Sequence, residues 1–362
     1  MSPISLYSAR SSRVCRASLF AYDIDSMGMT NSERKISLVR IAHVYYTHAD
    51  IAKAHEFLAD FGFQITKVIG KSTYYRGYGS EPFVYCAREG AENEFGGAAF
   101  VVESLDDLEY ASETLPNASA VYELTEAPGG GKCVTFHDPV DGFPFHLVYG
   151  QDAADVTALP ELVFNFVCTA HGNDFRSSLT AAQPTNKHRA VNQFQRFQKA
   201  PSPIHKLGHF GMCVTDFAAT YKFYTTRFNF VPSDTSYDSS GQDVITFLHL
   251  DRGKELVDHH CYFFFEGPVS HVHHSSFETH DFDTQVLGHD WLRHKGYENC
   301  WGVGRHILGS QIFDYWFDPS NFILEHYVDG DLVDNRSKPN RSPASPDGLH
   351  VWGPDLPPTF LV

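Results

Sequence analysis

The sequence predicts an α+β fold made of four repeated βαβββ modules, two in each half of the chain. The main observation is an internal repeat with a period of about 165 residues, in which residues 37–63 resemble residues 207–230. Each copy reads as a strand with a histidine, a helix preceded by Asp, and a closing Phe-Gly-Phe or Phe-Asn-Phe. The 30 Phe and 18 Tyr support this prediction, because aromatic residues favour β-rich cores.

The first half contains two such modules. Residues 37–46 alternate as a strand does, and residues 49–61 have apolar positions at helical spacing before Gly62. Residues 95–115 read as a strand, an acidic turn and a helix, and residues 137–150 as the closing strands.

The second half repeats this pattern. Residues 207–214 are the predicted strand and residues 215–230 contain the helix. Residues 273–297 again read as strand, acidic turn and helix, and residues 317–330 echo the closing segment of the first half.

The length of 362 residues suggests two domains with extensions. A linker rich in Gln, Asn and Ser separates the halves, and the last segment is rich in Pro, Ser and Asp. We therefore predict a disordered extension (1–36), an N-terminal domain (37–150), a connecting segment (151–204), a C-terminal domain (205–331) and an irregular tail (332–362).

Composition excludes several classes of partner. With a formal net charge of −16, the chain is not expected to bind nucleic acid or an anionic membrane, and no stretch is apolar for long enough to cross a bilayer. The seven cysteines are scattered without a CxxC pair, so we expect no disulfide framework and a reducing, cytoplasmic location. Residues 1–22 have the composition of a mitochondrial transit peptide, but a disordered tail is the favoured interpretation.

Residues 301–331 contain the most informative motif. FDYWF and FILEHYV read as two buried strands joined by a turn at Asp318-Pro319, and so form a hairpin. Glu325 lies within an apolar strand of this hairpin, where a carboxylate is costly to bury unless a partner such as a metal ion pairs with it. The rest of the sequence is therefore expected to supply further ligands.

The repeat identifies these candidates. The equivalent strand positions of the second half hold His209, His274 and Glu325. Those of the first half hold His43, Gly97 and either Phe145 or His146, without a carboxylate. Two histidines and one carboxylate on one face are typical of non-haem Fe(II) sites with open positions, and Mn(II) would also fit. We therefore predict a duplicated scaffold with a metal site in its second half alone.

The motif in residues 301–331 resembles the signature of the type I extradiol catechol dioxygenases. These enzymes belong to the vicinal oxygen chelate superfamily, which includes glyoxalases and bleomycin-resistance proteins. The resemblance is strongest over residues 160–331, and the first half resembles the metal-free domain of the family. It implies two domains, each an open, barrel-like curved sheet. The matching motif residues are Gly304, His306, Tyr315, Asp318, Pro319 and Glu325, with Arg305 at the variable position between the first two.

Two positions depart from the family motif. Asn321 replaces a glycine, which is a mild change because Asn also tolerates the left-handed region. Asp314 replaces an apolar residue, and the sequence offers no explanation for it.

The resemblance implies three metal ligands, namely His209, His274 and Glu325. His273 is the alternative to His274, and only one of them is expected to ligate because neighbouring strand residues point to opposite faces. The resemblance also implies an acid–base histidine one strand earlier, a role that His260 fits better than His259.

Other residues are expected to contact the substrate. By the resemblance, His306 and Tyr315 would hydrogen-bond the substrate oxygens or bound dioxygen. Trp301 is expected on the substrate side of an aromatic, apolar pocket. Arg305 is a candidate clamp for a substrate carboxylate, although the composition around it favours a neutral catechol.

The implied activity is Fe(II)-dependent cleavage of a catechol by O₂ next to the two hydroxyls, in a homo-oligomer. Two alternatives stay open. A glyoxalase-type isomerase or lyase would use the metal only to polarise an oxygen, and full activity with a redox-inactive metal would favour it. A metal-free binding protein of the bleomycin-resistance kind would have vacant ligand positions, as the first half has and the second does not.

Overall fold

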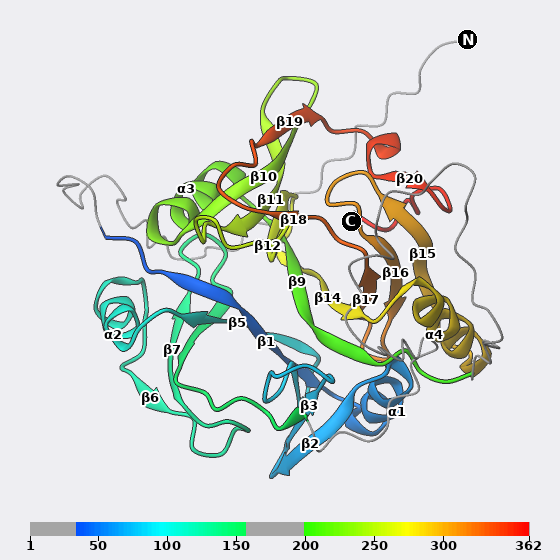
Figure 1. Ribbon diagram of the computed structural model, residues 1–362, viewed down its shortest axis with the longest axis horizontal. Helices are drawn as coiled ribbons and strands as arrows, with labels where there is room; N and C mark the ends of the chain where they lie inside the picture. Colours follow the sequence, from blue (N-terminus) through cyan, green and yellow to red (C-terminus); the bar gives the residue numbers. More distant parts are fainter. Residues whose placement is uncertain (1–33, 157–198, 362) are drawn as a thin grey trace, which may run out of the picture. The chain divides into compact units, whose positions relative to one another are not determined.

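The strands form two large sheets, one from each half of the sequence (Figure 1). The computed structural model describes residues 34–156 and 199–361. From Lys35 on, the described residues form one compact unit, so the boundaries between two domains stay a prediction. Nearly all of the predicted extension 1–36, including segment 1–22, and most of the connecting segment lie outside the described residues.

The four predicted βαβββ modules are present. The first half contains β1 (Leu38–His48), α1 (Ile51–Phe61), β2 (Gln64–Ile69), β3 (Ser72–Arg76) and β4 (Tyr85–Glu89), then β5 (Glu94–Val102), α2 (Leu105–Thr114), β6 (Tyr122–Glu123), β7 (Lys132–His137) and β8 (Pro144–Tyr149). The second half contains β9 (Ile204–Val214), α3 (Phe217–Arg227), β10 (Phe230–Tyr237), β11 (Asp243–Leu250), a short β12 (Val257–Asp258) and β13 (Tyr262–Glu266), then β14 (His271–Thr279), α4 (Phe282–Lys295), β15 (Asn299–His306), β16 (Ile312–Phe317) and β17 (Ile323–Val328).

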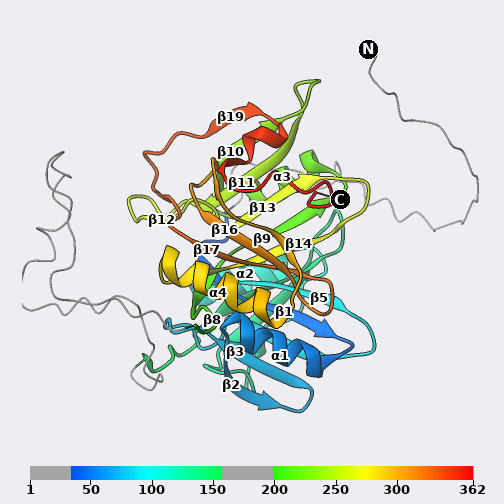
Figure 2. The same cartoon turned by 90° about the vertical axis from the view of Figure 1, so that its right-hand side faces the viewer.

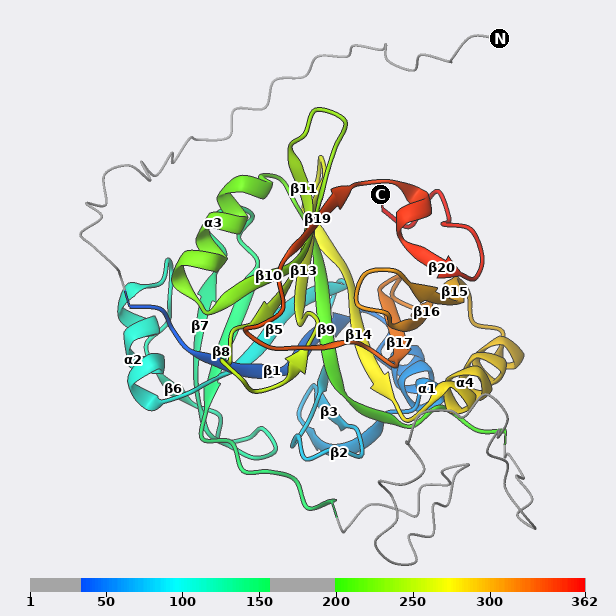
Figure 3. The ribbon, with the colours of Figure 1, turned by 45° about the horizontal axis from the view of Figure 1, so that its top comes forward.

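The two sheets share one strand order, as an internal repeat requires. The first runs β2-β3-β4-β1-β5-β8-β7-β6, and the second runs β10-β11-β13-β9-β14-β17-β16-β15 with one more strand at each edge. The opening strands of the two modules pair antiparallel at the centre of each sheet, β1 with β5 and β9 with β14. Both sheets are curved (Figures 1 and 3), which confirms the predicted α+β class.

The repeated helices begin for the same local reason. The side chain of Asp50 accepts a hydrogen bond from the backbone of Lys53 at the start of α1, and Asp216 does the same for Ala219 at the start of α3. Such caps satisfy amide groups that the first helical turn leaves without partners. Gly62 ends α1 with a φ of 110°, a conformation that glycine adopts without strain.

The two halves share a core and pack helix against helix (Figure 2). Trp291 of α4 and Tyr297, which follows the helix, both donate hydrogen bonds to Asp60 of α1, at 2.9 and 3.0 Å. His326 of β17 donates through Nε2 to the carbonyl of Phe61 at 2.7 Å. Because neighbouring strand residues point to opposite faces, this contact with the first half directs Glu325 to the other side of the sheet.

The tail departs from the prediction of irregular structure. It contains β18 (Leu332–Val333), β19 (Asn340–Pro343), a 3₁₀ helix (Pro346–Gly348) and β20 (His350–Trp352). β19 pairs with β10 and β20 pairs with β15, so the tail covers both edges of the second sheet (Figure 3). Covering an edge satisfies backbone groups that would otherwise be free to pair with other chains.

Two findings bear on the expected location. Five cysteines in the described ranges are free and buried: Cys86, Cys133, Cys213, Cys261 and Cys300. Among the helices that the structure describes, none has both the length and the apolar character of a membrane span.

The hairpin of β16 and β17 forms as predicted. Asn321 in its turn has a φ of 68°, the left-handed conformation expected of a residue that replaces glycine. Asp318 Oδ1 accepts hydrogen bonds from the backbone of Ser320 and Phe322, both at 2.8 Å. Burial raises the pKa of Asp318 to about 7, although these two hydrogen bonds oppose the shift.

The raised pKa of Asp318 predicts a pH-dependent stability. An unfolded carboxyl titrates near pH 4, so between about pH 4 and 7 the folded protein binds the proton more tightly than the unfolded chain, and its stability falls as the pH rises. In the Asp318→Asn variant the amide keeps an acceptor oxygen for the turn but no longer titrates. We expect the free energy of unfolding of the wild type to fall relative to the variant by up to about 1.4 kcal/mol per pH unit.

Urea unfolding at several pH values in this window measures the difference. Two parallel pH profiles would show that the carboxyl of Asp318 is not held protonated in the folded protein.

Candidate metal centre

Neighbouring strands carry the three predicted ligands. His209 lies on β9, His274 on β14 and Glu325 on β17, and these strands are adjacent in the sheet. Ser276 of β14 lies opposite His209 on one side and opposite Glu325 on the other. Since Ser276 and His274 are two residues apart, all three ligand candidates point to the same face of the sheet.

The ligand atoms lie at distances suited to one ion. His209 Nε2 and His274 Nε2 are 3.1 Å apart, and Glu325 Oε2 lies 3.2 Å from the former and 3.3 Å from the latter. Ligands at about 2.1 Å from a metal and at right angles to one another are separated by about 3.0 Å. The three atoms therefore fit one face of an octahedral coordination sphere, with the opposite face open.

The burial of these groups also fits a cation. Glu325 is fully buried, and its Oε1 has no hydrogen-bond partner among the described residues. Burial raises the pKa of Glu325, but the two histidines outweigh this effect and hold the pKa well below its usual range. Burial lowers the pKa of His274, which favours the neutral imidazole that binds metals.

Residues 34–156 of the first half contain no such cluster of ligands, and the register identifies the equivalent residues. Ala99 pairs with His146 where Ser276 pairs with Glu325, so His146 rather than Phe145 is the equivalent of Glu325. Its Nε2 donates to the carbonyl of Gly96 and its Nδ1 accepts from Thr135 Oγ1, both at 2.8 Å. Because neutral groups satisfy both nitrogens, this position needs no cation.

His273 lies differently from the prediction. A register shift between Val272 and His274 interrupts the alternation of β14, so His273 does not point to the opposite face but lines the same pocket. Its Nδ1 lies 2.7 Å from His274 Nδ1, and its Nε2 donates to the carbonyl of Phe360. His273 Nδ1 must then accept the proton of His274 Nδ1, which leaves His274 Nε2 free to ligate.

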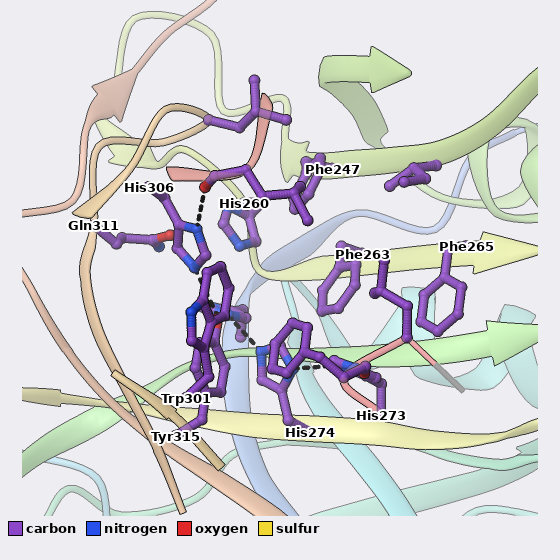
Figure 4. A pocket seen from close by; sticks show the side chains of 16 residues that line it. Phe247, His260, Phe263, Phe265, His273, His274, Trp301, His306, Gln311 and Tyr315 are labelled. Carbon is purple, nitrogen blue, oxygen red and sulfur yellow. Dashed lines mark hydrogen bonds between the residues drawn. The ribbon is translucent and has the colours of Figure 1, made fainter. Parts of the chain in front are cut away.

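His260 lies beside the candidate metal centre and lines the pocket (Figure 4). Its ring centre is 4.2 Å from that of His209, and burial lowers its pKa well below the ordinary value. Its Nδ1 lies 3.1 Å from His259 Nδ1, and His259 Nε2 lies 2.8 Å from Asp234 Oδ2.

The relay Asp234–His259–His260 fixes the proton on His260. Burial raises the pKa of Asp234, but hydrogen bonds from His259 and Asn340 outweigh it, so the pKa is lowered and the group is an anion. The anion accepts the Nε2 proton of His259, whose Nδ1 then accepts from His260 Nδ1. His260 Nε2 is thereby left as a proton acceptor for a ligand. The sequence did not predict a role for Asp234, because this residue lies on another strand, β10, 25 positions before His259.

His306 and Tyr315 form a second pair at the site. His306 Nδ1 donates to the carbonyl of Leu349 at 2.7 Å, and burial lowers its pKa to about 4, so the ring is neutral at pH 7. Its Nε2 therefore accepts from the Tyr315 hydroxyl at 2.8 Å. Tyr315 lies directly opposite Glu325 in the hairpin and 5.0 Å, ring to ring, from His274.

The two predicted substrate residues have different places. Trp301 is buried in the pocket wall, 5.9 Å from the nearly parallel ring of Tyr315, and donates to the carbonyl of Pro354 at 2.9 Å. Arg305 does not reach the pocket. Its guanidinium donates to the carbonyl of Ser310 at 2.6 Å and lies 3.4 Å from Asp329, so the structure does not bring it to a substrate.

The structure explains Asp314. It points away from the candidate metal centre, to the side of β16 opposite Tyr315. Its Oδ1 accepts from His289 of α4 and from Asn299, both at 3.0 Å, and its Oδ2 accepts from Trp316 Nε1 at 2.7 Å. The carboxylate thus anchors helix α4 to the hairpin that carries Glu325.

The tail closes the pocket. Leu349, Phe360 and Leu361 belong to its lining, and the free space inside is about 50 Å³. This volume holds a few water molecules but is small for a ligand pocket, so we expect a bound substrate to displace part of the tail. The signal in the sequence for this role of the tail was the apolar segment Thr-Phe-Leu-Val after a polar, Pro-rich stretch.

Comparisons with known proteins agree with this geometry. Residues 206–325 match the family model of the Glyoxalase/Bleomycin resistance protein/Dioxygenase superfamily. Metapyrocatechase 2 of Cupriavidus necator is 30% identical over 157 residues, which cover 43% of this chain and 47% of that protein. The match therefore spans about half the length of this curated relative.

Two solved structures share the fold over most of the chain. The Mn(II)-bound glyoxalase from Novosphingobium aromaticivorans has a TM-score of 0.67 and 21% identity, and the match covers 90% of this chain and 97% of that one. Homoprotocatechuate 2,3-dioxygenase from Brevibacterium fuscum, in complex with 3,4-dihydroxyphenylacetate, has a TM-score of 0.70 and 17% identity, with coverages of 90% and 92%. Together these findings confirm the resemblance to the extradiol dioxygenases of this superfamily.

The geometry predicts how a Glu325→Gln variant binds metal. Loss of an outer-shell partner alone costs about 10- to 100-fold in affinity, so we expect the loss of a ligand to cost at least about 100-fold. Asp314→Asn is the matched control, because it neutralises another fully buried carboxylate in the same hairpin that faces away from the site. Metal content after anaerobic loading, and competition with a chelator, measure the difference. Equal affinity of both variants would place the metal elsewhere.

Proposed function

We propose that this chain is an extradiol dioxygenase that cleaves the ring of a catechol with O₂ next to the two hydroxyls. We propose Fe(II) as its metal, with Mn(II) as the alternative. The observation that carries the proposal is the buried set His209, His274 and Glu325, whose ligand atoms lie 3.1 to 3.3 Å apart on one face. When bound, such a metal lowers the pKa of coordinated hydroxyls and supplies the redox chemistry that O₂ requires.

The open face of this set suits a chelating ligand. Three protein ligands leave up to three positions, which is enough for both oxygens of a catechol and for O₂. Aromatic side chains line the pocket at this face, and the ring of His274 is held by the hydrogen bond between its Nδ1 and His273 Nδ1. The site is thus prepared for a flat, bidentate substrate.

His260 is the proposed proton carrier. Its Nε2, kept as an acceptor by the relay through His259 and Asp234, takes a proton from a catechol hydroxyl and returns it later in the reaction. On the other side the Tyr315 hydroxyl, oriented by its donation to His306 Nε2, can accept a hydrogen bond from a substrate hydroxyl, so His306 acts on the substrate through Tyr315. Trp301 forms part of the adjoining wall.

The names of similar proteins support this proposal. The curated relative is a metapyrocatechase, and one solved structure of the same fold is a homoprotocatechuate 2,3-dioxygenase in complex with a catechol. By the same resemblance we propose a homo-oligomer, which light scattering on the purified protein tests.

A glyoxalase-type isomerase or lyase is the second candidate. The Mn(II)-bound glyoxalase, which shares the fold over nearly its whole length, favours it. A metal-free binding protein is disfavoured by the buried Glu325, because a carboxylate without a cation is costly to bury. Activity with a redox-inactive metal such as Zn(II) distinguishes the isomerase from the oxygenase.

The direct test is oxygen uptake by the anaerobically purified, Fe(II)-loaded protein with a panel of catechols. We expect uptake of one O₂ per catechol and a yellow ring-opened product, both lost in the Glu325→Gln variant. No uptake with any catechol, although the protein binds one metal ion, would contradict the dioxygenase proposal and favour the isomerase.

The relay predicts a second result. The Asp234→Asn variant presents an amide N–H to His259, which reverses both histidines and turns His260 Nε2 into a donor. We expect kcat to fall about 10- to 100-fold with unchanged metal content and a changed pH profile, and His260→Ala to cost about 100-fold or more.

Asp243→Asn is the matched control for the relay. Asp243 binds Arg341 of β19 as Asp234 binds Asn340, but it contacts neither histidine. If both Asp variants had the same kcat and pH profile, Asp234 would only anchor the tail. Loss of metal in His260→Ala would mean that His260 is a ligand.

A further inference from the structure

One side of the pocket at the candidate metal centre is aromatic and includes Phe247, Phe263 and Phe265 (Figure 4). Ile245 and Phe247 of β11 lie directly opposite Phe265 and Phe263 of β13. Residues two apart on a strand share a face, and so do residues that pair across two strands. All four side chains therefore belong to the same surface.

This wall begins at the candidate metal centre. The ring of Phe263 lies 5.1 Å from that of His274, and the ring of Phe247 lies 5.1 Å from that of His260. The rings of Phe247 and Phe263 stack at 5.3 Å. A substituent on a catechol bound at the metal would therefore meet aromatic surface from its first carbon onward.

The facing side already holds an apolar ring. Phe360 of the tail lies 4.9 Å from Trp301, 4.8 Å from Tyr315 and 4.7 Å from His273, measured between ring centres. These three rings form a socket in which the phenyl group packs edge to face. When a substrate displaces the tail, the surface that Phe360 leaves is aromatic as well.

No charged side chain balances an anion in this pocket. Among the described residues that line it there is no Asp, Glu, Lys or Arg. Arg305, the expected clamp, is directed to Ser310 and Asp329 instead. A carboxylate on the substrate would thus lose its hydration without gaining a charged partner, which is strongly unfavourable.

We propose that the substrate is a catechol with an uncharged, apolar ring substituent, an alkyl or aryl group that packs between the β11–β13 wall and the Phe360 socket. This inference rests on the proposed dioxygenase function and adds the substrate class. Carboxylated catechols are poor substrates of this site.

Two matched pairs of catechols test the substrate class. Propylcatechol and (2-carboxyethyl)catechol, each substituted at ring position 3 or at position 4, differ only in a methyl group against a carboxylate. With the Fe(II)-loaded protein we expect kcat/KM to be at least about 100-fold higher for the propyl compound, and about 10- to 50-fold higher for propylcatechol than for catechol itself. Equal or better turnover of the carboxylate, with catechol cleaved, would overturn the substrate class and leave the proposed function intact.

A binding measurement separates the two proposals. Anaerobic calorimetry with the metal-loaded protein is expected to give the same preference in Kd, with a negative heat-capacity change for the propyl compounds. Absence of cleavage for every catechol would refute the dioxygenase, while the Kd values still decide the apolar preference.

One substitution tests the wall itself. Ile245→Arg places a cation beside Phe265 at this surface and is expected to shift the ratio of kcat/KM by at least about tenfold towards the carboxyethyl compound. Val269→Arg is the control, because Val269 is 68% exposed outside the pocket and should leave the ratio unchanged. An unchanged ratio in a folded Ile245→Arg protein would contradict the proposed place of the substituent.

Discussion

The structure depends on a buried carboxylate. Glu325 has no accessible surface and lies within an apolar strand, where an anion is costly unless opposite charge is close. The Nε2 atoms of His209 and His274 lie 3.1 Å from each other and 3.2 and 3.3 Å from Glu325 Oε2. A divalent cation between the three atoms would relieve all of these contacts at once, so we interpret the sheet, the relays and the pocket around one proposed metal ion.

Hydrogen bonds around the site determine which ring nitrogen of each histidine carries the proton. A backbone carbonyl only accepts, so the carbonyls of Phe360 and Leu349 determine which nitrogen of His273 and of His306 carries the proton. The anionic Asp234 does the same for His259 and His260. Phe360 and Leu349 both belong to the tail, so the segment that closes the pocket also fixes the protonation of its histidines.

Much of this arrangement could be predicted from the sequence, because the internal repeat allows equivalent positions of the two halves to be compared. The Asp caps of α1 and α3 and the hairpin of β16 and β17 depend on local residues, and His209, His274 and Glu325 stand out by comparison with the first half. There the equivalent of His274 is Gly97, whose φ of 99° and approach to the carbonyl of Pro144 leave no room for a side chain.

Other features depend on contacts that sequence patterns do not record. The place of His273 follows from a register shift in β14, and a bulge has no clear sequence signature. The buried carboxylate of Asp314 is explained by its hydrogen bond from His289, which lies on helix α4 and is distant in the sequence. The strands β19 and β20 have four and three residues and form because the edges of the second sheet need partners, so their own composition did not predict them.

The most direct measurement is the anomalous scattering of crystals of the metal-loaded protein, collected on both sides of the metal absorption edge. We expect one peak at about 2.1 Å from His209 Nε2, His274 Nε2 and a carboxylate oxygen of Glu325. A peak on other residues, such as His273 or the His43 and His146 positions of the first half, or no peak at a site whose carboxylate is protonated, would contradict it.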